Sequence, residues 1–332
     1  MKRRNILQIG AAALGVAATG LDHPAAAQAN LVLKASDVHP PGYPTVVAVE
    51  NMGKKLEAAT KGRISVQMYP SMQLGGEKEA LEQAQVGAIA LARVSVGVVG
   101  PLVDDVNVFN LPFVFRSSEH MDKVIDGPIG KELLDKVTNN PNSHLIGLCF
   151  MDAGARSMYD TKRPMKTIDD LKGLKIRVMG NPIYVDMANA LGANGVPMGY
   201  DQVFSALQTG VIDGAENNMP SFVFDNHYQV AKYYTFTEHL IVPEMLLMSR
   251  PIWDKMSKDD QALIVKFSKE AQLDERKLWD EKEKDALARM KAAGIEIVYL
   301  KDKTPFQKAV KPVWDKYGAK YADLIKRIDA VK

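Results

Sequence analysis

The sequence predicts an α/β protein built as two lobes, in which helices pack on the faces of largely parallel sheets. Short apolar runs of strand character alternate with helical patterns, and this alternation starts again near residue 145. One long, highly charged helical pattern follows in the last third of the chain. The length of 332 residues suits about two ordinary domains.

The first set of elements begins at residue 31, where apolar and polar residues alternate as in a half-buried strand. A turn-forming cluster at 37–42 separates this strand from a helical pattern. The expected elements are a strand at 31–35, a helix ending near 59, a strand at 63–69, a helix at 77–85 and a strand at 88–94. Strands that alternate with helices in this way favour parallel pairing.

The second set begins with an apolar run at 145–150 that predicts a buried strand. The elements expected after it are a short helix from 167, a strand at 174–179, a helix at 201–209 ended by Gly210, and a strand at 211–216. Cys149, the only cysteine, lies in the first of these strands, so we expect an inert core residue. A single cysteine also excludes an internal disulfide or a paired-cysteine metal or redox site.

A long helix is predicted from Ser257 to residue 293. Ser257 suits the N-cap, two aspartates fill the first turn, and Gly294 can end the helix. At 1.5 Å per residue such a helix reaches roughly 55 Å, more than the diameter of one domain. We therefore expect it to connect two lobes, formed by residues 30–153 plus 243–285 and by residues 154–242 plus 286–332.

The N-terminus has the pattern of a cleavable export signal over residues 1–27. Lys2, Arg3 and Arg4 precede an apolar stretch at 6–21, and small residues suited to cleavage follow at 25–29. The arginine pair also resembles a twin-arginine signal, and an ordinary secretory signal fits equally well. After this segment no apolar run approaches the length of a membrane helix, so we expect an exported protein that is not itself inserted in the membrane.

Charge and motifs exclude several classes of function. The chain has 42 basic and 40 acidic residues, and without the signal 39 of each remain, which argues against a nucleic-acid or anionic-membrane binder. No nucleophile elbow, zinc-protease motif, phosphate-binding loop or dinucleotide fingerprint is present. Six scattered histidines show no metal-ligand spacing. We therefore predict no catalytic residue, no metal site and no cofactor.

Three arginines at expected strand ends predict a site for an anion. Arg177 lies near the end of the 174–179 strand, Arg156 follows a run of small residues, and Arg93 follows residues 88–92. Ligands of open α/β sheets bind beyond the carboxyl ends of the strands, and a guanidinium can hold a carboxylate with two hydrogen bonds. For each arginine alone, a structural salt bridge is the alternative. Together the three favour an anion pocket.

Several motifs, in order along the chain, resemble those of the solute-binding proteins of tripartite ATP-independent periplasmic (TRAP) transporters. They are NLPFVFR at 110–116, DLKGLKIR at 170–177, MGYDQVFSALQTGVIDGAENN at 198–218 and TEH at 237–239. The similarity extends over nearly all of the chain after the signal segment.

This resemblance implies a periplasmic binding protein fold and a receptor function. Two lobes would close on a carboxylate ligand, a sugar acid such as a uronate or an aldonate, and deliver it to the TRAP membrane subunits. Relatives of this kind are expected to be monomers. The resemblance assigns the ligand carboxylate to Arg177, with Arg156, Asn217 and Tyr200 nearby and Asn181 within reach of the same end. It assigns ligand hydroxyls to His39, Glu77 and Arg93.

One departure from the family pattern and two alternatives stay open. Sugar-acid members often have tryptophan where this chain has Met219, which leaves the size and ring form of the ligand undecided. An exported enzyme acting on an acidic sugar would use Glu77 and a second carboxylate as acid and base. A partner that presents its ligand to a sensor would have the same residues as a transport receptor.

Overall fold

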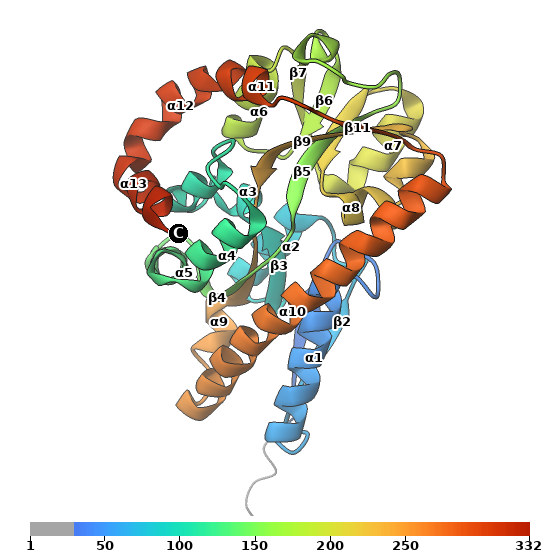
Figure 1. The fold of residues 1–332 in the computed structure, drawn as a ribbon. Coiled ribbons are helices and arrows are strands. Elements are labelled where there is room, and N and C mark those ends of the chain that lie inside the picture. The colour runs from blue at the N-terminus through green and yellow to red at the C-terminus, as the bar shows by residue number, and fades with distance from the viewer. Residues whose placement is uncertain (1–29) are drawn as a thin grey trace, which may run out of the picture.

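The protein folds around two mixed β-sheets that are flanked by helices (Figure 1). The computed structural model describes residues 30–332, so the expected export signal at 1–27 lies outside the described residues. The first sheet has the strand order β2-β1-β3-β10-β4, and the second sheet has the order β11-β9-β5-β8-β6-β7. The prediction of an α/β fold with two sheets is confirmed.

The first sheet contains residues from the beginning of the chain together with one later strand. Its strands are β1 (Leu31–Ser36), β2 (Ile64–Tyr69), β3 (Leu91–Ser95), β4 (Leu145–Met151) and β10 (Glu244–Ser249). The helices on its side are α1 (Pro44–Ala59), α2 (Glu77–Val86), α3 (Val96–Val99), η1 (Asp104–Asn110), α4 (Ser118–Asp126), α5 (Pro128–Asn139) and α9 (Arg250–Trp253). β1 pairs in parallel with β2 and β3, whereas β10 is antiparallel to β3 and β4.

The second sheet is formed by the middle of the chain and one C-terminal strand. Its strands are β5 (Ala155–Asp160), β6 (Lys175–Val178), β7 (Asn194–Pro197), β8 (Gly214–Asn217), β9 (Tyr233–Ile241) and β11 (Glu296–Tyr299). Its helices are η2 (Ile168–Leu171), α6 (Pro182–Ala190), η3 (Tyr200–Gln202), α7 (Val203–Thr209), α8 (Met219–Phe224) and η4 (His227–Gln229). β6 is parallel to β7 and β8, and β5 is antiparallel to β8 and β9.

Two of the connections between the sheets are neighbouring antiparallel segments of the chain. Residues 152–154 connect β4 to β5, and residues 242–243 connect β9 to β10, while β4 pairs with β10 and β5 with β9. Each sheet therefore contains one strand, β10 or β5, that runs antiparallel to the others, and the remaining strands are parallel as expected. Gly154 adopts φ +58°, and a Cβ atom there would lie 2.7 Å from Glu283 Oε1. A side chain is therefore disfavoured at this crossing both by the backbone and by the space available.

The predicted long helix is confirmed as α10 (Lys258–Ala292), which passes along both sheets (Figure 1). The Ser257 hydroxyl accepts a hydrogen bond from the Asp260 backbone N–H at 3.1 Å, and Gly294 follows the helix with φ +70°. The helix packs against α1 and β4 on the side of the first sheet and against α8 on the side of the second. It thus connects the two halves of the protein with one continuous element.

The C-terminal helices return from the second sheet toward the first. They are α11 (Thr304–Ala309), α12 (Lys311–Tyr317), η5 (Gly318–Tyr321) and α13 (Ala322–Ala330). α12 packs on α6, whereas α13 packs on α5, where Arg327 Nη2 contacts Glu132 Oε2 at 2.7 Å. α13 therefore lies on the side of the first sheet.

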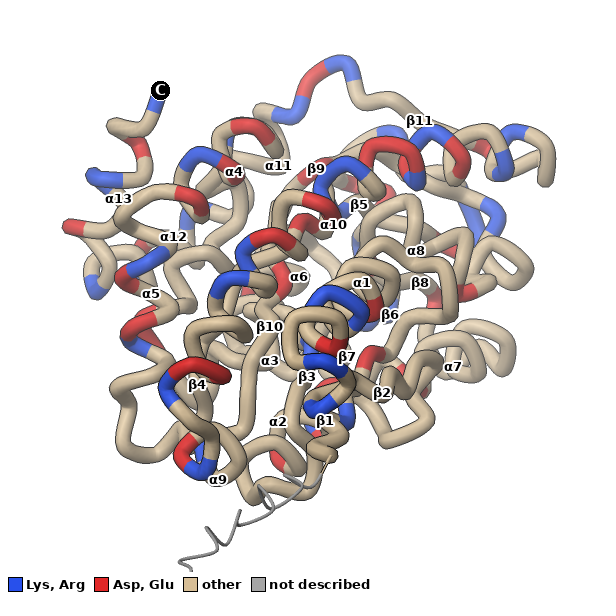
Figure 2. The backbone as a smooth tube through the Cα atoms, turned by 90° about the horizontal axis from the view of Figure 1, so that it is seen from below, with Lys and Arg blue, Asp and Glu red and all other residues tan. Residues whose placement is uncertain are grey.

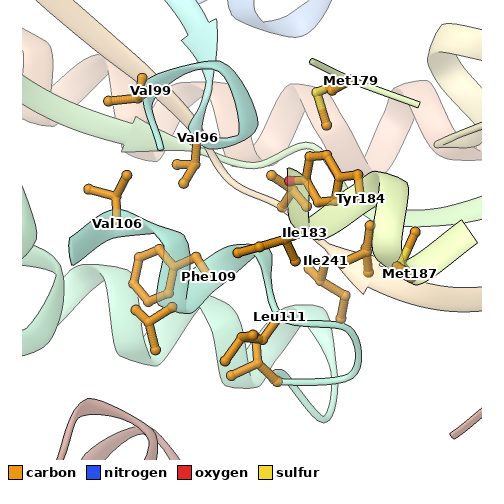
Figure 3. Close-up of a cluster of buried hydrophobic side chains, with 14 of the residues drawn as sticks. Val96, Val99, Val106, Phe109, Leu111, Met179, Ile183, Tyr184, Met187 and Ile241 are labelled. Carbon is orange, nitrogen blue, oxygen red and sulfur yellow. The ribbon is translucent and has the colours of Figure 1, made fainter. Parts of the chain in front are cut away.

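An apolar interface joins the two sides next to the crossing strands (Figure 3). Val96 and Phe109 of the first-sheet side and Met179 and Tyr184 of the second-sheet side belong to one apolar cluster, and all four are buried. A Cβ at Gly97 would come within 2.7 Å of the Tyr184 ring. The absence of a side chain at position 97 is what lets the two sides pack this closely.

The outer surface mixes charges of both signs. In the view of Figure 2, Lys and Arg alternate with Asp and Glu along the outer helices, α10 included. Among residues 30–332, no helix combines the length and the apolar character needed to cross a membrane.

Candidate functional site

A small polar cavity lies between the two sheets. Its volume is about 20 Å³, and it adjoins an outer groove of about 660 Å³ that shares Glu77, Arg177, Met179 and Tyr200 with it. The first-sheet side contributes Val38, His39, Glu77, Ser95 and Glu244 to this inner cavity. The second-sheet side contributes Arg156, Arg177, Met179, Tyr200, Asn217, Asn218 and Ser221. Most of these side chains can form hydrogen bonds, so the lining suits the polar groups of a ligand, and the enclosed space itself holds about one water molecule.

Arg177 is a buried guanidinium that has no acidic partner in residues 30–332. It stands on β6, and its Nε and Nη2 atoms donate to the Met198 carbonyl at 2.9 and 2.8 Å. Burial lowers the pKa of Arg177, because no carboxylate within contact distance compensates the lost hydration. The side chain lines both the inner cavity and the outer groove. It therefore presents an unneutralised positive charge to any ligand between the sheets.

Arg156, by contrast, is neutralised by Glu216 on the adjacent strand β8. Arg156 Nε lies 2.6 Å from Glu216 Oε2, and Nη2 lies 2.9 Å from Glu216 Oε1. This ion pair holds the pKa of Glu216 at about 2 despite the opposing effect of burial. Arg156 Nη1 also donates to Asn217 Oδ1 at 2.7 Å, and the Asn218 N–H donates to the same oxygen at 2.9 Å. With its oxygen engaged, Asn217 keeps its amide Nδ2 hydrogens for a ligand.

The first-sheet wall of the cavity is acidic. Arg93 Nη1 donates to Glu77 Oε1 and to Glu244 Oε2, each at 2.7 Å, and Nη2 donates to Asp37. One guanidinium thus serves three carboxylates. Burial, together with the neighbouring charge of Glu77, raises the pKa of Glu244 to about 7. Glu77 begins α2, where a carboxylate is also favoured by the helix dipole.

Two side chains close the cavity by linking the sheets directly. His39 Nδ1 lies 3.0 Å from Asp225 Oδ2, and the Tyr200 hydroxyl donates to the same oxygen at 2.7 Å. Tyr43, whose ring stacks on His39 at 3.8 Å, places its hydroxyl 2.9 Å from Ser221 Oγ. His39 and Tyr43 follow β1, whereas Asp225 and Ser221 belong to the α8 region. The structure is therefore closed, with hydrogen bonds between the two sides.

Six of the eight side chains expected at the site line the inner cavity, and two do not. The six are His39, Glu77, Arg156, Arg177, Tyr200 and Asn217. Arg93 lies beneath the wall, enclosed by its three carboxylates, because it occupies the middle of β3 and not the end of a strand. Asn181 caps α6 and donates to the Gly97 carbonyl at 3.1 Å and to Asn107 at 2.9 Å. Its hydrogen bonds are used within the interface between the sheets.

Of the three arginines, only Arg177 lies near the carboxyl end of a strand, as expected. Arg177 is third of the four residues of β6, but Arg156 is the second residue of β5, at the amino end of an antiparallel strand. Met219, the departure from the family pattern, does not line the inner cavity; it packs in the apolar cluster behind α8.

Sequence reasoning missed several lining residues, of which Glu244 is the most informative. Glu244 is the one charged residue in an otherwise apolar stretch from 240 to 248, which is a signal for a buried functional carboxylate. Asn218 and Ser221 follow Asn217 directly and belong to the start of α8. In residues 30–332, no group of three His, Cys, Asp or Glu side chains is arranged to hold a metal ion.

Comparison with known proteins finds bacterial solute-binding proteins, both by sequence and by structure. The family of bacterial extracellular solute-binding proteins, family 7, matches residues 35–320. The C4-dicarboxylate-binding periplasmic protein of Rhodobacter capsulatus is 32% identical over 311 residues, which cover 92% of this chain and 91% of the relative. A TRAP periplasmic solute-binding protein of Pseudomonas putida F1, solved with bound D-glucuronate, is 55% identical. That structure overlays with a TM-score of 0.89 over 91% of this chain and 98% of its own.

A TRAP periplasmic solute-binding protein of Citrobacter koseri has been solved in two states. The D-glucuronate-bound structure is 50% identical and overlays with a TM-score of 0.89, covering 91% of this chain and 99% of that one. The apo, open structure overlays with a TM-score of 0.79 at 47% identity, covering 90% and 98%. The better overlay on the bound form agrees with the hydrogen bonds that link the two sheets here. Because the family match spans most of its length, the chain belongs to the bacterial extracellular solute-binding proteins of family 7, a family of receptors and not of enzymes.

Proposed function

We propose that this protein is a periplasmic receptor for a hexuronate, which it delivers to the membrane subunits of a TRAP transporter. The observation that carries this proposal is Arg177, a buried cation on the cavity wall with no carboxylate within contact distance in residues 30–332. A ligand carboxylate supplies the missing charge with charge-assisted hydrogen bonds. The D-glucuronate bound to the Pseudomonas putida and Citrobacter koseri relatives supports this ligand class.

The surrounding groups suit the remainder of a sugar acid. The free amide hydrogens of Asn217 can join Arg177 in binding the carboxylate. The carboxylates of Glu77 and Glu244 on the opposite wall accept hydrogen bonds from hydroxyl groups. Because the two sets of partners belong to different sheets, the ligand makes all its hydrogen bonds only when the protein is closed. Binding therefore shifts the open–closed equilibrium toward the closed form.

We propose that the two sheets and their helices act as lobes that move about residues 152–154 and 242–243. The lobes would comprise residues 30–153 plus 243–285 and residues 154–242 plus 286–332, with α13 attached to the first. Residues 1–27 are proposed as a cleaved export signal, of the twin-arginine or the ordinary secretory type, and the mature receptor as a monomer.

Calorimetric titration tests the ligand class. We expect D-glucuronate or D-galacturonate to bind tightly. D-glucose has a hydroxymethyl group where D-glucuronate has the carboxylate, and it should bind at least about 30-fold more weakly, since truncating one partner of a buried charge pair costs about 2–5 kcal/mol. Recovery of unchanged ligand after incubation distinguishes a receptor from an enzyme. Equal binding of D-glucose, or no binding of any sugar acid, would contradict the proposal.

A further inference from the structure

The two walls of the inner cavity carry opposite charge. Arg177 lies on the second-sheet wall, whereas Glu77 and Glu244 lie on the first-sheet wall. Arg93 compensates the acidic wall only in part, because the same guanidinium also donates to Asp37. Three carboxylates share one positive charge, so this wall keeps an excess of negative charge when they are ionised.

Two carboxylate oxygens of the acidic wall receive no hydrogen bond from residues 30–332. Arg93 and the Ser95 N–H engage Glu77 Oε1, and Arg93 engages Glu244 Oε2. In residues 30–332, no hydrogen bond is formed to Glu77 Oε2 or Glu244 Oε1. The two side chains are only 11% and 7% exposed, so water screens their charges weakly. Such oxygens accept readily from a neutral hydroxyl and repel an anion.

We propose that Glu77 and Glu244 restrict this receptor to sugar acids with a single carboxylate and exclude dicarboxylates such as aldarates. The inference rests on the proposed function, because it takes Arg177 as the partner of the first carboxylate. With that end fixed, the far end of the ligand faces the acidic wall. A hydroxyl group at that end donates a hydrogen bond to a carboxylate oxygen of the wall. A second carboxylate has no proton to donate and adds like charge to a poorly hydrated wall.

Family membership alone does not decide whether the receptor accepts ligands with one carboxylate or with two. One relative, from Rhodobacter capsulatus, is a C4-dicarboxylate-binding protein, whereas others were solved with a monocarboxylate sugar acid. A clamp for one carboxylate is compatible with either ligand. The number of carboxylates accepted must therefore depend on the wall opposite the clamp, and in this chain that wall is acidic.

The decisive measurement is the ratio of the dissociation constants of D-glucarate and D-glucuronate. The two ligands share their hydroxyl configuration, and D-glucarate has a carboxylate in place of the aldehyde carbon. By calorimetric titration at pH 7.5 we expect D-glucarate to bind at least about 100-fold more weakly, since a juxtaposed like charge costs several kcal/mol. In competition, D-glucarate should fail to displace D-glucuronate from the wild-type protein.

The Glu244→Gln and Glu77→Gln variants remove one negative charge each and keep the side-chain size. We expect each to reduce the ratio at least tenfold, even if D-glucuronate itself binds less tightly. Glu57→Gln provides the control, because Glu57 is an exposed residue of α1 that lines neither the inner cavity nor the outer groove and should leave the ratio unchanged.

The outcomes separate this inference from the proposed function. Equal binding of both ligands to the wild-type protein overturns the inference and leaves the receptor for sugar acids intact. A ratio that stays high in both glutamine variants also overturns it, because the exclusion would then be due to ligand shape. If D-glucuronate and every other sugar acid fail to bind the wild-type protein, the proposed function itself is wrong.

Discussion

Arg156 and Arg177 face the same cavity from the two strands that flank β8, but only Arg156 is paired with a carboxylate. Arg156 forms two hydrogen bonds with the Glu216 carboxylate and a third with the Glu216 backbone carbonyl, whereas Arg177 donates only to the Met198 carbonyl. The two buried arginines therefore have different energetic roles. Arg156 supports the folded protein, and Arg177 holds a charge that the ligand neutralises.

Replacing Arg177 should weaken ligand binding strongly and leave the fold intact. In Arg177→Met we expect the free energy of binding a hexuronate to fall by about 2–5 kcal/mol, because the ligand carboxylate loses its buried partner. The ligand-free variant should also unfold about 2–4 °C higher than the wild type, since it no longer buries an unpaired charge. Calorimetric titration and thermal unfolding measure the two effects. Wild-type affinity in this variant would refute the clamp assignment.

Replacing Arg156 should have the opposite effect on stability. Arg156→Met leaves Glu216 buried without its main partner, so we expect a loss of about 3–5 kcal/mol in the free energy of unfolding. The double variant Arg156→Met/Glu216→Gln should recover most of that loss, because the unpaired charge is removed as well. Urea denaturation of the three proteins tests this. Equal destabilisation of the single and the double variant would contradict the ion-pair argument.

The contact between His39 and Asp225 predicts that a change at Asp225 weakens closure of the protein, although Asp225 itself does not line the ligand cavity. Asp225 does not line the inner cavity, yet it binds His39 across the sheets and accepts from Tyr200. We expect Asp225→Asn to weaken hexuronate binding about tenfold, since a hydrogen bond to a charged group contributes roughly 1.5–3 kcal/mol. Small-angle scattering should show a lower fraction of the closed form at equal ligand concentration.

Asp186→Asn is the matched control for that variant. Asp186 also accepts from a tyrosine and a basic side chain, at 2.6 Å from the Tyr317 hydroxyl and 2.7 Å from Lys316 Nζ. Its partners lie on α12, so the contact does not link the two sheets. We expect unchanged affinity in the control, and a similar loss in both variants would show that the effect is not due to closure.

The partly buried carboxyl of Glu283, at the crossing between the sheets, predicts a pH-dependent loss of folding stability. Burial, together with the charge of Asp152, raises the pKa of Glu283 to about 7. Because the folded-state pKa exceeds the unfolded value, the contribution to stability is complete below about pH 4.5 and is lost as the pH rises through 7. Glu283→Gln should therefore gain stability relative to the wild type between pH 5 and pH 8. Thermal unfolding checks this against Glu281→Gln, an exposed neighbour expected to show no such trend.

Helices and their ends can be predicted from the sequence because the residues that start and stop a helix lie next to it in the chain. The capping serine, acidic first turn and terminal glycine placed α10 within one residue of its observed limits. The same kind of signal was present at Asn181 and Pro182, an N-cap followed by proline at the first helical position, and it identifies Asn181 as a capping residue. The expectation that Asn181 binds the ligand rests only on its closeness to Arg177 in sequence and does not use this capping signal.

The remainder of the site depends on pairing between distant segments. Arg93 was expected at a strand end, but β3 continues to Ser95 because β10, from 150 residues later in the chain, pairs with it. That pairing also brings Glu244 beside Arg93 and Glu77. Neither the antiparallel crossings nor the acidic wall can be deduced from periodicity, because both are set by contacts between parts of the chain that are far apart in sequence.

The packing of α10 against the crossing at Gly154 gives the protein a built-in optical probe. Trp279, one of three tryptophans, is 2% exposed, and its indole would lie 3.0 Å from a Cβ at position 154. Its ring also meets Tyr43, which contacts the other side of the cavity. Any rotation of the sheets about residues 152–154 must change the surroundings of this indole. In a protein whose other two tryptophans, Trp253 and Trp314, are replaced by phenylalanine, the fluorescence of Trp279 should therefore follow opening and closing in real time without an attached dye.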